Sequence, residues 1–395
     1  MRVSTLGFQT DASNQMQSLE AQITQTQTEL STGIALQNAA DNPAAMAQVT
    51  QLNVQVSASK QYQTNGGALN SNLQIEEQSL ADATTTMQSA RDLAVEANNA
   101  SLTTSQRQDI ATQLQQLLQQ LVSTANSTDS NGQYLFSGET SATQPFSQSG
   151  SSVTYNGSTS VSQVQISTNQ RISSGDSGAN VFMNLPAGNG TFTTAVSAGN
   201  VGSATIDTGT LTNSSQWVPD TYTITFTDPT DYKVTNSSGT TVTSGTYATP
   251  GTIAFNGIST TITGTPAAGD SFTVAPAGKA SAFSTLSNLV NALNNPNLSS
   301  AQISSQVGTA VEQIDAAVSN FSNVSASVGA RINAITAAGT TATATQTALT
   351  GQVSSLQDVN YAAATTQLSM QELALQAAQE SYASIAKMSL FSYLQ

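Results

Sequence analysis

Few side chains in this sequence of 395 residues have the types and spacing that binding or catalytic chemistry requires. Asp228 and Asp231 lie on either side of a proline in the stretch "DPTD", and paired carboxylates are ligands that Ca²⁺ accepts. The same arrangement is typical of a tight turn, in which the aspartate accepts hydrogen bonds from the backbone. The turn is the favoured interpretation, because two carboxylates beside a proline form turns far more often than metal sites.

Histidine and cysteine are both absent from the sequence. Without them the chain lacks the usual general base, the thiolate nucleophile and the His- or Cys-based transition-metal site. No GxSxG motif occurs to present a nucleophilic serine, and the HExxH signature of zinc peptidases cannot be formed. The sequence therefore predicts a protein that is not an enzyme, with no catalytic residue, no cofactor and no metal.

Two features concern carbohydrate. Asn-X-Ser/Thr sequons occur at four positions, as a chain rich in serine and threonine produces by chance, namely Asn156, Asn189, Asn213 and Asn236. Aromatic side chains able to stack on sugars occur in the same region, namely Trp217, Tyr222, Tyr232 and Tyr247. Packing into a core is the alternative role of these rings. A secreted adhesive or carbohydrate-binding module is therefore one alternative function.

Charge is sparse and acidic. Charged residues make up 8% of the chain, against about 25% in ordinary soluble proteins, and the net charge is −14 with nine lysines and arginines. So few basic residues form no patch for phosphates, so nucleic acid and anionic membrane surfaces are not expected partners. No stretch reaches the roughly 20 apolar residues that span a bilayer, and the N-terminus lacks the apolar block of a cleaved signal peptide.

Composition divides the chain into three zones. Residues 1–138 and 280–395 are rich in Gln, Ala, Leu and Ser with helical spacing, whereas residues 139–279 are rich in Thr, Ser, Gly and Val with strand alternation. This order predicts an α+β multidomain protein. Both chain termini would form a long helical bundle, antiparallel and similar to a coiled coil, which carries an inserted antiparallel β-rich region of one or two small β units with thin cores.

Local signals place the elements within these zones. Asn131-Gly132 and Asn256-Gly257 predict tight turns, the second one joining two strands. Asp41 or Asn42 is expected to cap a helix, with Pro43 in its first turn. Ser105 with Gln108 is a possible capping box, "NGG" at 65–67 and Gly339 are possible breaks, and "DVN" at 358–360 is a further cap. Helices are expected over 4–31, 44–98, 105–125, 283–293, 300–356 and from 361 onward.

The first and last helical segments each carry a narrow apolar seam at steps of three and four residues. Isolated helices of this length are marginal and are stabilised by packing. We therefore expect each seam to be buried by the opposite terminus and then by neighbouring copies, although a purely intramolecular core is the alternative. The expected assembly seam consists of Met16, Leu19, Ile23, Leu30, Leu368, Leu375, Ala378, Tyr382, Ile385 and Leu390.

Motifs at both ends of the chain resemble the bacterial flagellin family. They are "LSTG" (30–33), "ADNPAAMAQ" (40–48), "ARDLAVEANN" (90–99), "NGQYLFSG" (131–138) and the ending that includes "SLFSYL" (389–394). The resemblance covers roughly residues 1–140 and 280–395 and says least about the β-rich insertion. "ADNPAA" and the ending are similar to the hook-associated branch rather than to filament subunits. The sequence departs from the family in lacking a basic residue shortly after "LSTG".

The resemblance implies a structural subunit of the bacterial flagellum at the junction between hook and filament. It implies terminal helices that line the inner tube of the axial assembly, with the β segment facing outward. The implied partners are further copies of the chain in a ring, hook-associated protein 1, flagellin and a flagellar export chaperone. The implied location is extracellular, reached by type III export without a cleaved signal peptide. A flagellin that forms the filament itself is the other alternative.

Overall fold

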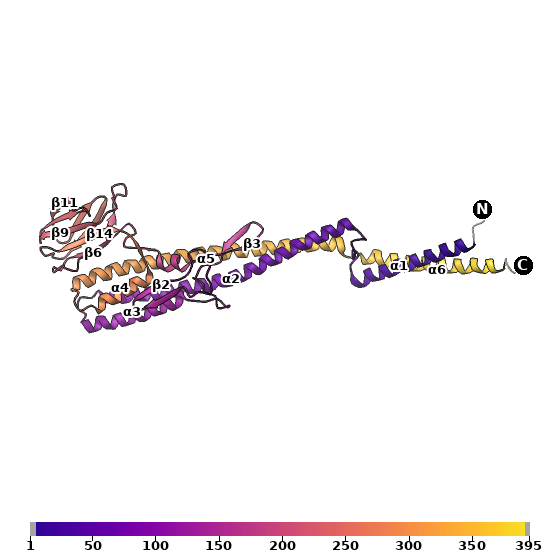
Figure 1. The fold of residues 1–395 in the computed structure, drawn as a ribbon, viewed down its shortest axis with the longest axis horizontal. Helices are drawn as coiled ribbons and strands as arrows, with labels where there is room; N and C mark the ends of the chain where they lie inside the picture. The colour runs from indigo at the N-terminus through magenta and orange to yellow at the C-terminus, as the bar shows by residue number, and fades with distance from the viewer. Residues whose placement is uncertain (1–4, 392–395) are drawn as a thin grey trace. The chain divides into compact units, whose positions relative to one another are not determined.

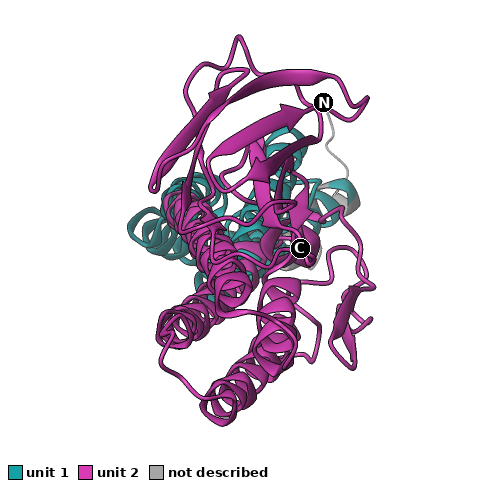
Figure 2. Cartoon of the chain, turned by 90° about the vertical axis from the view of Figure 1, so that its left-hand side faces the viewer, with its two compact units in different colours: residues 1–64, 338–395 teal, residues 65–337 magenta. Residues whose placement is uncertain are grey.

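The computed structural model describes residues 5–391, which form two compact units (Figure 2). One unit comprises residues 1–64 and 338–395, and the other comprises residues 65–337. The boundaries between them therefore fall within two long helices. The division into residues 1–138, 139–279 and 280–395 is based on composition and differs from this division into two units. It remains a proposal about domains.

The helices lie close to their expected positions, and the two possible breaks within them do not occur. Neither the "NGG" stretch nor Gly339 interrupts a helix. Gly66 is buried, and a Cβ atom at this position would lie 3.3 Å from Cγ2 of Ile335, so the glycine permits close approach of two helices. Within the described residues the helices are α1 (Thr5–Thr32), α2 (Pro43–Ala97), α3 (Thr104–Ala125), α4 (Ala282–Asn294), α5 (Ser300–Gln357) and α6 (Tyr361–Phe391).

The capping box of α3 lies two residues before its expected place. Thr103 has an extended backbone (φ −71°, ψ 160°), and its side chain accepts a hydrogen bond from the Gln106 backbone while the Gln106 side chain accepts from the Thr103 backbone. Ser105, expected to pair with Gln108, lies inside the helix instead. Both pairs fit the sequence pattern of a capping box, and the structure places the extended residue that such a cap requires at Thr103.

The sequence of α2 repeats apolar residues every seven positions, with Glu76 as a polar interruption, which predicts a buried seam. This seam is the helical core of the unit 65–337. Its positions are all buried, namely Leu69, Leu73, Leu80, Ala83, Met87, Ala90, Ala94 and Ala97. Along α3 the buried face includes Ile110, Leu114, Leu118 and Leu121, at steps of three and four residues, whereas Leu117 is only half-buried. From α5, Ile314 and Phe321 complete this core.

Phenylalanine side chains join the loops of this unit to its helices. Gly132 (φ 76°) forms the predicted turn of "NGQYLFSG", and the chain then inserts Phe136 into a buried aromatic cluster. The ring of Phe136 lies edge-on to Phe182 with centroids 5.2 Å apart, and Phe182 lies 5.2 Å from Phe321 of α5. The motif is thus a structural anchor of the chain as it leaves the helices.

The β region, expected to hold one or two small β units, contains two larger sheets and three small ones among the described residues. A five-stranded sheet has the order β11-β10-β9-β14-β6, and a four-stranded sheet has the order β12-β13-β7, with β8 also pairing with β13. Figure 1 labels β11, β9, β14 and β6 of the first sheet. Three two-stranded sheets accompany them, and all pairings are antiparallel. The strands are β1 (Phe146–Ser149), β2 (Ser152–Tyr155), β3 (Gln163–Ser167), β4 (Gln170–Ser173), β5 (Leu185–Pro186), β6 (Phe192–Val196), β7 (Thr205–Ile206), β8 (Thr210–Leu211), β9 (Tyr222–Asp228), β10 (Asp231–Thr235), β11 (Thr241–Thr246), β12 (Gly251–Phe255), β13 (Ile258–Thr263), β14 (Ser271–Pro276) and β15 (Lys279–Ala280).

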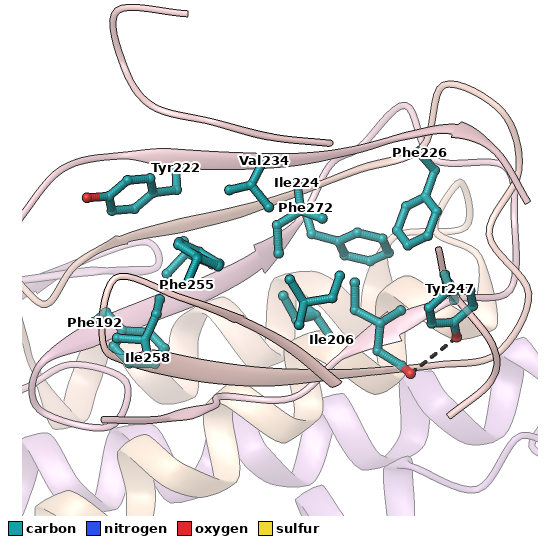
Figure 3. Close-up of a cluster of buried hydrophobic side chains, with 14 residues drawn as sticks. Phe192, Ile206, Tyr222, Ile224, Phe226, Val234, Tyr247, Phe255, Ile258 and Phe272 are labelled. Carbon is teal, nitrogen blue, oxygen red and sulfur yellow. Dashed lines mark hydrogen bonds between the residues drawn. The ribbon is translucent and has the colours of Figure 1, made fainter. Parts of the chain in front are cut away.

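The two larger sheets share one hydrophobic core, so the expectation of thin cores is wrong (Figure 3). Each strand contributes only two or three large side chains, but the two sheets combine them into a single cluster of buried residues. Tyr222 and Tyr247 belong to this core, and the Tyr247 hydroxyl donates to the carbonyl of Ile262 at 3.2 Å. Trp217 and Tyr232 pack against it from outside. These rings are therefore packing residues, which contradicts a sugar-stacking role for Tyr222 and Tyr247.

The predicted hairpin at Asn256-Gly257 is confirmed. Phe255 pairs with Ile258 across a two-residue turn in which both central residues have positive φ, 45° and 74°. This is the geometry of a type I′ turn, which favours Asn-Gly. The Gly257 carbonyl also accepts hydrogen bonds from two backbone N–H groups of the segment after β8.

Gly257→Ala is expected to destabilise the β core by about 2–3 kcal/mol. The added Cβ would lie 2.2 Å from the Asn213 carbonyl oxygen, in addition to the strain of positive φ. Gly239→Ala is the matched control, because Gly239 also has positive φ (80°) but faces open space, so about 1 kcal/mol is expected. Urea unfolding, followed by the fluorescence of the single tryptophan, Trp217, measures the loss of unfolding free energy in each variant. Equal losses in the two variants would contradict the steric part of this account.

Candidate assembly surface

Helices α1 and α6 pack side by side and antiparallel within the unit 1–64/338–395 (Figure 1). Their connections to the long helices meet in a short bridge, in which Ala35 N–H donates to the Gln357 carbonyl at 2.8 Å. Further along, the Thr26 hydroxyl donates to the side-chain oxygen of Gln371 at 3.0 Å. The helix pair therefore has a defined register, fixed by hydrogen bonds at one end and in the middle.

The predicted seam residues lie on these two packed helices. The eight whose side chains are described are all half-buried, and none is fully buried, namely Met16, Leu19, Ile23, Leu30, Leu368, Leu375, Ala378 and Tyr382. Ile385 and Leu390 have side chains outside the described part of the chain. Among the side chains described on these two helices, Thr26 and Ala364 are the most buried, and the steps of three and four residues include both. A two-helix pair shields one side of each seam and leaves the other side to water.

A second apolar row on α6 lies outside the predicted seam. Met370 is 64% exposed and Leu373 is 68% exposed, and Tyr361 at the start of the helix is also exposed. Beside this row runs an open groove of about 680 Å³, lined by Leu19, Ala363, Thr366, Gln367, Met370, Gln371 and Ala374. Exposed apolar side chains that adjoin a half-buried seam are typical of an interaction surface. The seam and this row together form the candidate assembly surface.

The residues that define this surface are uncharged, although acidic residues lie elsewhere on the same two helices. Between residues 5–32 and 361–384 the charged residues are Asp11, Glu20, Glu29, Glu372 and Glu380, all acidic. Dense packing of helices bearing so few charges brings few like charges together. The described helices include none with the length and hydropathy to cross a membrane, and the described side chains include no group of three or more potential metal ligands.

The "DPTD" stretch forms the turn between β9 and β10, as favoured from the sequence. Oδ1 of Asp228 accepts hydrogen bonds from the Thr230 hydroxyl (2.7 Å), the Thr230 N–H (2.8 Å) and the Asp231 N–H (3.0 Å). These bonds, that of the Thr230 hydroxyl first, lower the pKa of the Asp228 carboxyl. The carboxylate is thus occupied in holding the turn.

One buried charge cluster lies among α2, α5 and the loop before the π-helical turn (Ala179–Met183). Glu76 is 1% exposed and accepts a hydrogen bond from the Asp176 backbone at 3.0 Å, while Arg331 forms an ion pair with the Asp176 carboxylate. Arg331 also donates to the Gly175 carbonyl at 3.1 Å. Burial, and then the nearby Asp176 charge, raise the pKa of Glu76. The polar interruption of the α2 seam therefore ties a loop to two helices.

Comparison with known proteins relates this architecture to axial proteins of the flagellum. The family model of the bacterial flagellin N-terminal helical region matches residues 3–141, and that of the C-terminal helical region matches residues 311–394. Between them, residues 195–276 match the D2-like domain of flagellar hook-associated protein 1. The last match falls on the part of the chain that contains the two larger sheets.

Individual relatives agree. Flagellar hook-associated protein 3 of Salmonella typhimurium is 32% identical over 157 residues, which is 40% of this chain and 49% of the relative, so the chain spans about half the length of this curated relative. Hook-associated protein-3 of Legionella pneumophila has a solved structure that superposes with a TM-score of 0.74 at 32% identity, covering 78% of this chain and 98% of that one.

A second solved structure, described as the flagellar junction protein FlgL of Legionella pneumophila, superposes with a TM-score of 0.70 at 31% identity. It covers 79% of this chain and 100% of that chain. The two superpositions thus cover more than three quarters of this chain and nearly all of each solved structure. The chain therefore belongs to the bacterial flagellin family, in its branch of flagellar hook-associated protein 3 (FlgL) proteins.

Proposed function

We propose that this protein is a structural subunit of the bacterial flagellum that forms the junction between hook and filament. It would do so by self-assembly of the helices at its two termini. The relatives described as hook-associated and junction proteins support this role. They are structural proteins, and the chain lacks the histidine and cysteine on which many enzymes depend. A catalytic role has no support in the described side chains.

The observation that carries the proposal is the incomplete burial of the α1–α6 pair. Its seam residues remain half-exposed, and Met370 and Leu373 are largely exposed beside them. Each large apolar side chain removed from water contributes about 1.5–3 kcal/mol. Packing of neighbouring copies against this surface would bury what one chain leaves uncovered.

The expected partners follow from the position of a junction. A ring of identical copies would contact hook-associated protein 1 on one side and flagellin on the other, and an export chaperone would hold the chain before assembly. The protein would be extracellular, exported by the flagellar route without a cleaved signal peptide. These partners are proposals that rest on the family.

Labelling of intact cells tests the position directly. Antibodies against the two larger sheets should mark a single site at the base of each filament. Label along the whole filament would instead identify the protein as a filament subunit. Label on the cell surface away from flagella would overturn both.

The double variant Met370→Asp/Leu373→Asp is expected to fold as a monomer and to fail in assembly. Both side chains are exposed in the single chain, so the monomer should lose no more than about 0.5 kcal/mol of stability per site. In the assembly each new carboxylate would be taken out of water without a partner. Complementation of a strain that lacks the protein should then give cells without attached filaments and without swimming.

Glu372→Gln is the matched control, since it changes an exposed polar residue between the two positions and should preserve swimming. Circular dichroism and urea unfolding of the purified variants establish that the fold is intact. Normal filaments in cells carrying the double variant would show that this face of α6 is not an interface.

A further inference from the structure

A cavity of about 500 Å³ lies between the edge strand β6 and the helices α4 and α5, all within the unit 65–337. None of its lining residues is charged. Six of them are amides, on one face of each helix, namely Asn288, Asn291 and Asn295 on or just after α4 and Gln302, Gln306 and Gln313 on α5. Hydroxyl groups of Thr194, Thr285, Ser305 and Thr309 add to the polar lining.

Part of this lining is held in place by the protein itself. The Gln302 side chain donates to the Ala198 carbonyl at 3.1 Å and accepts from the Ser299 N–H at 2.9 Å. The Thr285 hydroxyl donates to the side-chain oxygen of Gln313 at 2.9 Å. These bonds connect the segment that follows β6 to α5, and α4 to α5, so the walls of the cavity are formed before any ligand enters.

Other amides around the cavity have no partner. Among the described residues, the side chains of Asn288, Asn291 and Gln306 make no hydrogen bond within the protein, and all three are exposed. Each amide offers two donor hydrogens and an acceptor oxygen. Apolar side chains, among them Leu289 and Leu298, lie between them. The lining thus alternates neutral donors and acceptors with small apolar surfaces.

We propose that this cavity binds a neutral saccharide about the size of a disaccharide. Saccharide hydroxyls both donate and accept, as the amides and hydroxyls of the lining do, and their C–H faces suit the apolar residues between. The absence of charged side chains from the lining disfavours phosphates, uronic acids and charged peptides. The site is separate from the aromatic residues of the two larger sheets and from the assembly surface on α6.

Saturation-transfer NMR of the full chain with maltose and with N,N′-diacetylchitobiose tests this proposal. Signal transfer to at least one sugar is expected. The double variant Asn288→Leu/Gln306→Leu removes two hydrogen-bonding groups, so its affinity for the sugar should be about tenfold lower. Gln119→Leu on the exposed face of α3 is the matched control and should bind as the unmodified chain does. The methyl glycosides of both sugars are measured in parallel. Binding that is lost in the methyl glycosides would indicate a free reducing sugar, and binding that is kept would indicate the end of a longer saccharide chain.

Three results would overturn the proposal. The first is the absence of transfer from either sugar at millimolar concentration, which would mean that the cavity holds water only. The second is equal binding by the double variant and the control, which would place the sugar elsewhere. The third is equal or stronger transfer to glucuronate or to a neutral tetrapeptide, which would show that the lining does not select a neutral saccharide.

Discussion

Arg331→Met is expected to lower the free energy of unfolding of the unit 65–337 by about 3 kcal/mol. The substitution keeps an unbranched apolar stem but removes the cation that faces Asp176, and it leaves the Gly175 carbonyl without its donor. Glu76 and Asp176 would then lie together with no positive charge, and Glu76 is almost completely shielded from water. The helical transition in urea, followed by circular dichroism, should move to a lower concentration.

Arg91→Met is the matched control. Arg91 also bridges α2 and α5 through an ion pair, with Asp315 at 2.7 Å, but the two side chains are 43% and 50% exposed. An exposed pair contributes at most about 1 kcal/mol. If both arginine variants lost a similar free energy of unfolding, burial would not explain how much the cluster around Arg331 contributes to stability.

The same cluster gives a pH dependence of defined sign. Burial raises the pKa of Glu76, so the folded state binds that proton more tightly than the unfolded chain does. The contribution of this group to stability is therefore complete below the unfolded pKa of about 4.3 and declines as pH rises through the folded pKa. Glu76→Gln, which resembles the protonated form, should raise the urea midpoint at pH 8 and leave it unchanged at pH 4. A decrease at pH 8 would contradict this sign.

Phe226→Ala is expected to destabilise the β core by about 3–5 kcal/mol. Phe226 is fully buried between the two larger sheets. Its ring lies edge-on to Tyr247 at 5.2 Å and to Phe272 at 6.0 Å, and it is tilted against Tyr232 at 6.3 Å. Truncation therefore opens a cavity and removes three aromatic contacts. No neighbouring strand can move into this space without disturbing its own pairing.

Two spectroscopic signals localise the effect. The ring of Trp217 lies 5.6 Å from Phe192 at the edge of this core, so its fluorescence reports on the two sheets, whereas far-ultraviolet circular dichroism reports mainly on the helices. Phe226→Ala should shift the fluorescence transition by more than the helical one. Val201→Ala, at a side chain that is 82% exposed in the same β region, should shift neither. Coincident shifts of both signals would show that sheets and helices unfold as one.

The sequence alone determined the helical body, because its signals are local. Steps of three and four residues specified the buried face of α2 down to single alanines, and Asn256-Gly257 specified its hairpin through the positive φ that both residues adopt readily. Motifs at the two ends were enough to indicate the family. The seam on α1 and α6 was also visible, since a bare apolar stripe at each terminus requires a cover.

Only the tertiary structure decided what depends on contacts distant in sequence. The role of Gly66 as a point of helix contact depends on Ile335, and the role of Glu76 depends on Asp176 and Arg331, which lie about 100 and 255 residues further on. The burial of Tyr222 depends on a second sheet that no single strand reveals. Spacing along the chain reports which face of an element is apolar. Packing between segments that are distant in sequence decides which element covers that face and how completely it does so. A local sequence pattern contains no information about such distant contacts.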